Sequence, residues 1–400
     1  MTVVLKKSKA NGNVSAPPSK SMAHRYLICG AFSKKSEICG VSFSDDIKAT
    51  LSCLEALGAD IATNKDRVTI GGLDFGYTPQ KTLNCNESGS TLRFLIPICL
   101  LFGKEITLCG TKRLFSRSLS VYEQICKEQG IYFDLKEDSL TVCGKLKSGK
   151  YSVRGDISSQ FISGLIFALS KLGSDSEIEI TSKVESGSYL DLTIAALKDF
   201  GVNVERVNEH TIFIGGNNTY KSNEITVEGD YSNAAFLDAF NLFGGKVNIN
   251  NLKENSSQGD RVYKELFECL NNGCPTIDIS DCPDLAPVLM AVAAAKNGAV
   301  LEGTRRLKIK ESDRGLAMKE ELSKLGCFVL VEENIITVEK CELKTPSVPI
   351  CSHNDHRIVM AMSVLLCLTG GSIEGAEAVA KSYPDFFECL KALNVEANIE

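Results

Sequence analysis

The sequence lacks the long apolar segments that membrane insertion requires. No apolar run approaches the roughly 18 residues that a membrane span needs. The N-terminal segment MTVVLKKSKANGN also lacks the apolar region and small-residue cleavage site of a signal peptide. We therefore expect a cytoplasmic protein with no membrane partner.

Signatures of metal sites and disulfide frameworks are also missing. No Cys-x-x-Cys pair occurs, and the four histidines form no cluster with cysteine at the spacing of metal ligands. The 16 cysteines are scattered through apolar stretches, where cysteine behaves as a small hydrophobic residue. These patterns predict free thiols in a reducing compartment and no metal site.

A basic charge balance is absent as well. The formal net charge of -6 argues against a nucleic-acid partner, because proteins that bind nucleic acid usually present a basic face. At 400 residues the chain exceeds the usual size of one hydrophobic core, so we expect two domains.

What the sequence does contain is a repeated segment. An apolar helical run that opens with Ser, Gly or Asp and closes near Gly occurs six times, as SKSMAHRYLICGAFS, SGSTLRFLIPICLLFG, SSQFISGLIFALSKLG, SNAAFLDAFNLFGG, DLAPVLMAVAAAKNG and DHRIVMAMSVLLCLTGG. The copies begin about 70 residues apart, with one step shortened to about 50, at Ser19, Ser88, Ser158, Ser232, Asp284 and Asp355. This near-periodicity indicates a fold built from six copies of one unit.

Each helical copy is followed by a strand-like run and a second, amphipathic helix. In one such helix Leu192, Ala195, Ala196 and Phe200 lie on a single face. In most copies two alternating strands around a polar turn come next, as in ADIATNKDRVTI, IYFDLKEDSLTV and CFVLVEENIITV. The unit is therefore predicted to be βαβαββ, and the fold class α/β.

The six units divide into two similar domains. The fourth copy is shorter by about one hairpin, and the sixth ends after a single strand. The strand at residues 2–6 has no unit of its own, so we expect it to join the second domain. The predicted domains are 19–228 and 1–18 with 229–400, each of three units. Two chain crossings, near Pro17-Pro18 and Gly229, would form a hinge for closing over a ligand.

The first turns of the repeated helices carry small polar and basic residues. Helix N-termini present unpaired N–H groups and the positive end of the helix dipole, so they bind phosphate and carboxylate. A single Ser or Lys there is more often a helix cap or a surface charge, but recurrence in successive units favours a shared anion site. The residues concerned are Lys20, Ser21, Arg25, Ser88, Gly89, Ser90, Thr91, Arg93, Ser158, Ser159, Gln160, His356 and Arg357.

Two acidic residues stand among these cations. Asp284 opens the fifth repeated helix, and Glu311 lies between Lys310 and Arg314. Neighbouring cations favour the ionised form of a carboxylate, and an ionised carboxylate facing a substrate hydroxyl is a candidate general base. The alternatives are a helix N-cap for Asp284 and a salt-bridge partner for Glu311, and the sequence leaves both open.

Taken together, the segments resemble those of the 5-enolpyruvylshikimate-3-phosphate synthases. SKS, SGST, SSQ, KESDR, DHR and K-x-YPD occur in the family's order between Lys20 and Lys381, and KESDR followed about forty residues later by DHR is highly specific. The resemblance implies the enolpyruvyl transferase fold, an inside-out α/β barrel of two similar three-unit domains. It also implies a monomer without a cofactor that acts on the small molecules shikimate 3-phosphate and phosphoenolpyruvate.

The resemblance also implies roles for individual residues. Shikimate 3-phosphate would be bound by Lys20, Ser21, Arg25, Ser158, Ser159, Gln160, Ser186, Asp284 and Lys310. Phosphoenolpyruvate would be bound by Lys20, Gly89, Arg117, Gln160, Arg314, Arg357 and Lys381. The catalytic group would comprise Asp284, acting on the 5-hydroxyl, Glu311, in proton transfer at the enol carbon, and Lys20 with Lys381. Glu87 and Phe94 depart from the commoner pattern, which has Asn and Pro at these positions.

Three other functions fit the sequence less well. A sister family transfers the same group to UDP-N-acetylglucosamine, but it places a reactive Cys five residues before the equivalent of Arg117, where this chain has Lys112. A repeat scaffold without activity would not be expected to align Lys, Arg and an acid at its helix starts. A phosphate-end cyclase should show a nucleophilic His and a nucleotide site, and neither can be identified.

Overall fold

The computed structural model describes all 400 residues, which form two compact units. One unit is Pro18–Glu228, and the other combines Met1–Pro17 with Gly229–Glu400. Each unit has its own continuous cluster of buried apolar side chains, so each has the core of an independent domain. No helix combines the length and the apolar character that crossing a membrane would take.

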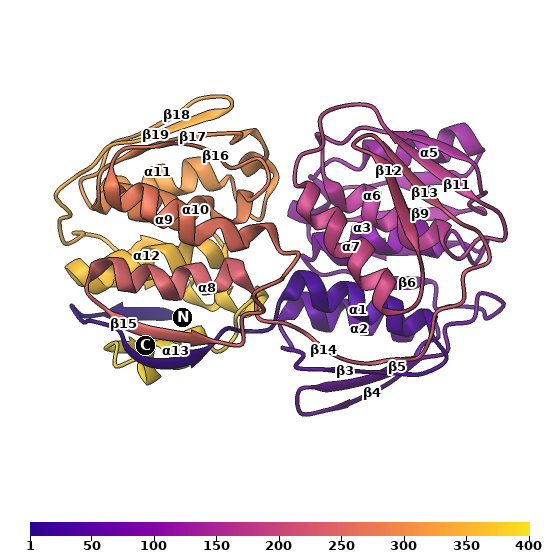
Figure 1. The fold of residues 1–400 in the computed structure, drawn as a ribbon, viewed down its shortest axis with the longest axis horizontal. Coiled ribbons are helices and arrows are strands. Elements are labelled where there is room, and N and C mark those ends of the chain that lie inside the picture. Colours follow the sequence, from indigo (N-terminus) through magenta and orange to yellow (C-terminus); the bar gives the residue numbers. More distant parts are fainter. The chain divides into compact units, whose positions relative to one another are not determined.

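The unit Pro18–Glu228 contains three four-stranded sheets (Figure 1). Their strand orders are β14 (Glu224–Thr226), β3 (Ser36–Cys39), β5 (Arg67–Gly71), β4 (Asp60–Asn64); β6 (Thr82–Asn84), β7 (Ile106–Cys109), β9 (Ser139–Cys143), β8 (Tyr132–Leu135); and β10 (Lys150–Val153), β11 (Ser176–Ile180), β13 (Thr211–Ile214), β12 (Val204–Asn208). In each sheet the first pair is parallel and the other two pairs are antiparallel, as a βαβαββ unit requires.

The helices of this unit are either buried along their length or amphipathic, with one face exposed. They are α1 (Lys20–Phe32), α2 (Asp45–Ala56), α3 (Gly89–Cys99), α4 (Lys112–Phe115), α5 (Ser120–Gln129), α6 (Ser159–Leu169) and α7 (Gly187–Asp199). Nearly every residue of α1, α3 and α6 is buried, which explains why these repeated segments are apolar on all sides. Buried helices surrounded by sheets are the arrangement expected of an inside-out α/β barrel.

The second unit repeats this plan with one reduced sheet. Its sheets are β20 (Ile350–Cys351), β21 (Gly371–Glu374), β1 (Thr2–Leu5), β22 (Ala397–Ile399); β16 (Thr276–Asp278), β17 (Ala299–Glu302), β19 (Ile335–Val338), β18 (Val329–Val331); and the pair β15 (Lys246–Asn250), β2 (Asn11–Ser15). Its helices are α8 (Tyr231–Asp238), α9 (Tyr263–Asn272), α10 (Ala286–Ala295), α11 (Arg314–Lys324), α12 (His356–Thr369) and α13 (Phe386–Ala392). The two-stranded sheet is the short fourth copy.

The N-terminal strand joins the second unit, as expected. Strand β1 pairs antiparallel with both β21 and β22, and so supplies the strand that the sixth copy lacks. The sequence did not reveal that two other units also complete their sheets with distant strands. Strand β14 pairs with β3 of the first copy, and β2 pairs with β15 of the fourth. The chain crosses to the other unit directly after each of these two strands.

Four of the six predicted helix starts are confirmed. The caps of α1, α3, α6 and α12 are Ser19, Ser88, Ser158 and Asp355. The expectation of Ser232 at the fourth start is wrong, because the Asp230 carboxylate accepts the Asn233 N–H at 2.8 Å and caps α8. Asp284 does not open the fifth helix. It lies in a 3₁₀ turn, η3 (Pro283–Leu285), and α10 follows at Ala286.

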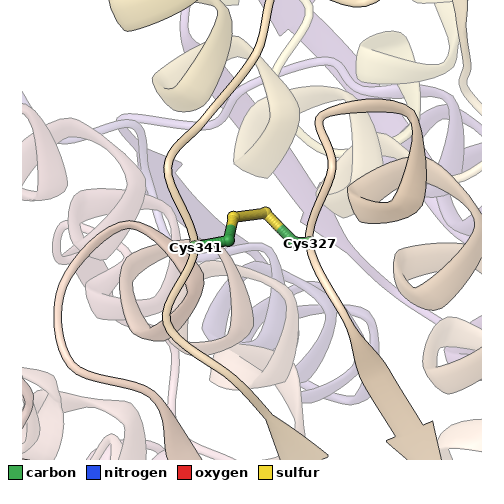
Figure 2. The surroundings of a disulfide bond; sticks show 2 residues. All are labelled: Cys327 and Cys341. Atoms are coloured by element: carbon green, nitrogen blue, oxygen red, sulfur yellow. A yellow bond between two sulfur atoms is a disulfide. The ribbon is translucent and has the colours of Figure 1, made fainter.

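The expectation that every thiol is free is also wrong. Figure 2 shows a disulfide between Cys327, which follows α11, and Cys341, which follows β19. Strands β18 and β19 pair with Val329 opposite Val338, so the segments flanking this hairpin lie side by side although the cysteines are 14 residues apart. Sequence spacing alone could not identify this pair. The other cysteines are free, and most are buried.

The close packing of α3 against α6 generates a prediction about Gly164. A Cβ atom at this position would lie 2.5 Å from the Arg93 carbonyl oxygen and would also collide with the Tyr122 hydroxyl. Overpacking of this kind typically costs about 1–3 kcal/mol, so Gly164→Ala should lower the free energy of unfolding by about that amount. Denaturant titration measures the change. Gly215→Ala is the matched control because a Cβ there meets no atom within 4 Å, and an equal loss in both variants would contradict the packing argument.

Candidate active site

The starts of α3 and α6, with the segment that follows α4, bring two arginines and a glutamine together in the unit Pro18–Glu228. Arg93 donates through Nη1 to Gln160 Oε1 at 2.8 Å, and Gln160 Nε2 donates to Ser90 Oγ at 3.0 Å. A Cβ atom on Gly89 would lie 2.8 Å from Arg117 Nη1 and 3.1 Å from Arg93 Nη1. Only glycine lets both guanidinium groups lie this close to the first turn of α3. The N-terminus of this helix is therefore surrounded by positive charge, as an anion site requires.

The first turn of α1 is held by neighbouring side chains of the same unit. Lys20 Nζ lies 2.7 Å from Asp46 Oδ2, and Asp46 stands in the first turn of α2. Ser21 contributes its carbonyl oxygen, which accepts from Arg25 Nη1 at 2.7 Å. Lys20 and Ser21 are thus half-buried neighbours at one helix start, next to an acid that lies outside the recognised motifs.

Arg25 lies inside the core and connects α1 to α7. Its guanidinium donates to Thr193 Oγ1 at 2.8 Å and to the Tyr189 carbonyl at 2.9 Å, and it stacks over Phe94 at 5.2 Å. Burial lowers the pKa of Arg25 to about 10, so the group remains a cation at neutral pH. The structure therefore gives Arg25 a bracing role, in addition to the substrate contact that the motif predicts.

Three predicted serines are also located at helix starts of this unit. Ser158 caps α6 by accepting the Gln160 N–H at 3.3 Å, and Ser159 is the first residue of that helix. Ser186 precedes α7 in the left-handed backbone conformation, with φ of 60°. All three side chains are buried.

In the second unit, three cations surround the carboxylate of Asp284. Its Oδ1 atom lies 3.1 Å from Lys310 Nζ and 2.8 Å from Arg314 Nη1, and its Oδ2 atom lies 2.8 Å from Arg357 Nη2. The 3₁₀ turn η3 supplies Asp284, and α11 and α12 supply the arginines in their first turns. The N-cap alternative for Asp284 is excluded, since its side chain faces this cationic cluster.

Arg314 is the centre of a second set of contacts. Its Nη2 atom lies 2.7 Å from Glu311 Oε2, and its Nε atom lies 2.9 Å from Asp355 Oδ2. Ser312 donates to the same Asp355 oxygen at 3.0 Å. Glu311 therefore forms the salt bridge that the sequence offered as an alternative role. Arg314 connects it to Asp284.

Burial and charge act in opposite directions on these groups. Burial alone would raise the pKa of Asp284, but Arg357, Lys310 and Arg314 hold it well below its usual range, so this carboxylate is ionised. Burial lowers the pKa of Lys310 to about 8, although Asp284 partly opposes this shift. Arg314 keeps a raised pKa because its acidic partners outweigh its burial.

Lys381 contacts the turn that precedes α12. Its Nζ atom donates to the carbonyl oxygen of Asn354 at 2.6 Å. His353 and Asn354 both adopt positive φ, 49° and 53°, directly before Asp355 caps α12. This turn connects Lys381 to the helix start that carries Arg357.

The structure gathers the predicted residues into two groups, one in each unit. Gly89, Arg117 and Gln160 meet at α3 and α6, whereas Lys310, Glu311, Arg314 and Arg357 meet around Asp284. Sequence reasoning missed Asp46 and Ser232 as partners of Lys20 and Arg357, because nothing in a single sequence pairs positions so far apart. It named Arg93 and Asp355 within their motifs without assigning them a partner.

Comparison with solved structures defines the fold. The fold matches an EPSP synthase from Acinetobacter baumannii with a TM-score of 0.79 at 22% identity, over all of both chains. It also matches the enolpyruvyl transferase NikO from Streptomyces tendae with a TM-score of 0.73 at 13% identity, over 99% of this chain and 98% of that one. The chain thus has the enolpyruvyl transferase fold that the repeats and the resemblance predicted.

Sequence comparison defines the family. The family model described as EPSP synthase (3-phosphoshikimate 1-carboxyvinyltransferase) matches residues 4–272 and 271–390. Proteins named 3-phosphoshikimate 1-carboxyvinyltransferase are 42% identical in Clostridium kluyveri, over 98% of this chain and 97% of that protein, and 41% identical in Clostridioides difficile, over 96% of each. The chain belongs to the EPSP synthase family, and it is a transferase.

The lowered pKa of Lys310 can be measured by competitive labelling with acetic anhydride, followed by mass spectrometry of the peptide. Labelling of Lys310 should rise with a midpoint near pH 8. In Asp284→Asn the midpoint should move to lower pH, because the carboxylate that stabilises the ammonium is removed while burial and Arg314 remain. Lys310→Arg identifies the peptide signal. An identical midpoint in the wild type and Asp284→Asn would show that the two groups are not coupled.

Proposed function

We propose that the protein transfers the enolpyruvyl group of phosphoenolpyruvate to the 5-hydroxyl of shikimate 3-phosphate and releases phosphate. This reaction belongs to the shikimate pathway of aromatic amino acid biosynthesis. Membership of the family supports the proposal, and so does the observation that carries it, an ionised Asp284 among Lys310, Arg314 and Arg357. Three cations grouped around one carboxylate suit the binding of two anionic substrates.

Each substrate has a proposed set of contacts. Shikimate 3-phosphate is bound by Lys20, Ser21, Arg25, Ser158, Ser159, Gln160, Ser186, Asp284 and Lys310, and phosphoenolpyruvate by Lys20, Gly89, Arg117, Gln160, Arg314, Arg357 and Lys381. The forked donors of arginine match carboxylate and phosphate oxygens and stay charged at any working pH. The helix starts that carry many of these residues add backbone N–H groups.

The proposed chemistry is an addition followed by an elimination. Asp284 takes the proton of the 5-hydroxyl as the hydroxyl oxygen bonds to the carbon of phosphoenolpyruvate that bears the phosphate. Glu311, protonated in this step, gives its proton to the methylene carbon. In the second step the Glu311 carboxylate takes a proton back from the new methyl group, the bond between carbon and the phosphate oxygen breaks, and the proton held by Asp284 leaves with the phosphate. Lys20 and Lys381 stabilise the negative charge of the departing phosphate.

UDP-N-acetylglucosamine is a less suitable acceptor. Lys112 stands where the sister family has a reactive Cys, and its Nζ atom lies 2.6 Å from Glu137 Oε2 at an exposed position. No thiol of this chain replaces that group in the matched motif. We further infer a monomer that works in the cytoplasm without a nucleic-acid partner, in keeping with the negative net charge.

The proposed reaction predicts which acceptor supports turnover. Phosphate should be released from phosphoenolpyruvate when shikimate 3-phosphate is present and not when UDP-N-acetylglucosamine replaces it. Coupled detection of phosphate measures both rates with the same preparation. Release with the sugar nucleotide, and none with shikimate 3-phosphate, would reject the proposal in favour of the sister reaction.

The role of Asp284 as general base predicts a loss of turnover with little loss of binding. Asp284→Asn should reduce kcat by about 10²–10⁴-fold, since proton transfer contributes this much, while shikimate 3-phosphate binds within about tenfold of the wild type. Rapid-quench kinetics and calorimetry separate the two effects. Asp313→Asn is the control, because Asp313 caps α11 by accepting the Leu316 N–H at 3.2 Å and makes no contact with the Asp284 carboxylate. Near-normal kcat in Asp284→Asn would remove this residue from the mechanism.

A further inference from the structure

The hydroxyl of Ser232, in the first turn of α8, lies between a carboxylate and a guanidinium group. Its Oγ atom donates to Asp230 Oδ1 at 2.7 Å and accepts from Arg357 Nη1 at 3.1 Å and Nη2 at 3.0 Å. Ser232 is 2% exposed and Arg357 is 4% exposed, so water does not compete freely for these bonds. No motif drew attention to this serine as a partner of the site.

The direction of these hydrogen bonds is determined by the chemistry of the groups. An ionised carboxylate can only accept and a guanidinium can only donate, so the single Ser232 proton points to Asp230 and its lone pairs face Arg357. Asp230 is itself fixed, because the same Oδ1 atom accepts the Asn233 N–H at 2.8 Å and caps α8. The serine therefore offers Arg357 a rigid pair of acceptor positions.

Arg357 donates hydrogen bonds to both Ser232 and Asp284. Its Nη2 atom donates to Asp284 Oδ2 at 2.8 Å, and its Nη1 atom donates to the Asp284 carbonyl oxygen at 3.2 Å. The bond to Asp284 neutralises charge, whereas the hydroxyl of Ser232 fixes the orientation of the guanidinium and leaves its charge intact. A cation that must also bind an anionic substrate gains from a neutral partner of this kind.

We propose that Ser232 is a positioning residue for phosphoenolpyruvate binding, acting through Arg357. The inference rests on the proposed contact between Arg357 and phosphoenolpyruvate. Without the Ser232 hydroxyl, the guanidinium keeps its bonds to Asp284 and turns toward that carboxylate. Arg357 then presents its charge poorly to the substrate, while the contacts proposed for shikimate 3-phosphate are unchanged.

The test is steady-state kinetics of Ser232→Ala with each substrate varied in turn. The KM for phosphoenolpyruvate should rise about 10- to 100-fold, the range that one hydrogen bond to a charged group represents. The KM for shikimate 3-phosphate and kcat should stay within about threefold. Ser232→Thr, which keeps the hydroxyl, should restore most of the affinity for phosphoenolpyruvate.

Ser363→Ala is the matched control, because Ser363 is buried on α12 and its hydroxyl donates only to the Val359 carbonyl oxygen, at 2.8 Å. It should leave both KM values unchanged. A lower Tm for Ser232→Ala with unchanged KM values would show that the serine only supports the fold, and would overturn the inference.

A double-mutant cycle with Arg357→Gln separates this inference from the proposed site. If Ser232 acts through Arg357, the double variant should have the same KM for phosphoenolpyruvate as Arg357→Gln alone. If Arg357→Gln raises this KM and Ser232→Ala does not, the role of Ser232 is wrong while the assignment of Arg357 stands. If Arg357→Gln leaves the KM unchanged, both the assignment of Arg357 and the inference built on it fail.

Discussion

The charge of one carboxylate offsets the repulsion among the three cations of the second unit. Lys310, Arg314 and Arg357 repel one another where water is scarce, and the acidic groups Glu311 and Asp355 pair with Arg314 among these three cations. Asp284 binds all three cations through its two oxygens. The same cations lower the pKa of Asp284 and keep it ionised. Attraction between this carboxylate and the three cations therefore both holds the cluster together and keeps the proposed base able to accept a proton.

In both units, the positions of the predicted site residues follow from the placement of the helices. Helices that lie between sheets are buried along their length, so the polar groups of their first turns need partners within the protein. Ser88, Ser158 and Asp355 meet this need as caps. Each capped start presents backbone N–H groups at the end of a buried helix. Gly89, Ser159 and Arg357 lie in these first turns. The repeat thus delivers an anion-binding element several times without any dedicated loop.

Each chain crossing follows a strand that pairs with a partner far away in the sequence but in the same unit. Strands β2 and β14 each complete a sheet in one unit immediately before the chain passes to the other. At the crossings, the Ser19 N–H donates to the Glu228 carbonyl oxygen at 2.8 Å, and the Asp230 N–H donates to that of Pro17 at 2.7 Å. Asp230 also caps α8 and orients Ser232, so the second crossing leads within a few residues to the contacts of Arg357.

The sequence by itself determined the repeated unit, its hairpins and four of the six helix caps, because helix periodicity, strand alternation and capping chemistry act over a few residues. It also determined the family, through motifs that each span one helix start. Only the tertiary structure decided which residues meet: Lys20 with Asp46, Ser232 with Arg357, and Cys327 with Cys341. These partners are separated along the chain, by 125 residues for Ser232 and Arg357, and are joined by strand register and helix packing. Asp284 illustrates the difference. The sequence predicted its place near a helix start, but its role as the shared partner of three cations arises only because α10, α11 and α12 pack together.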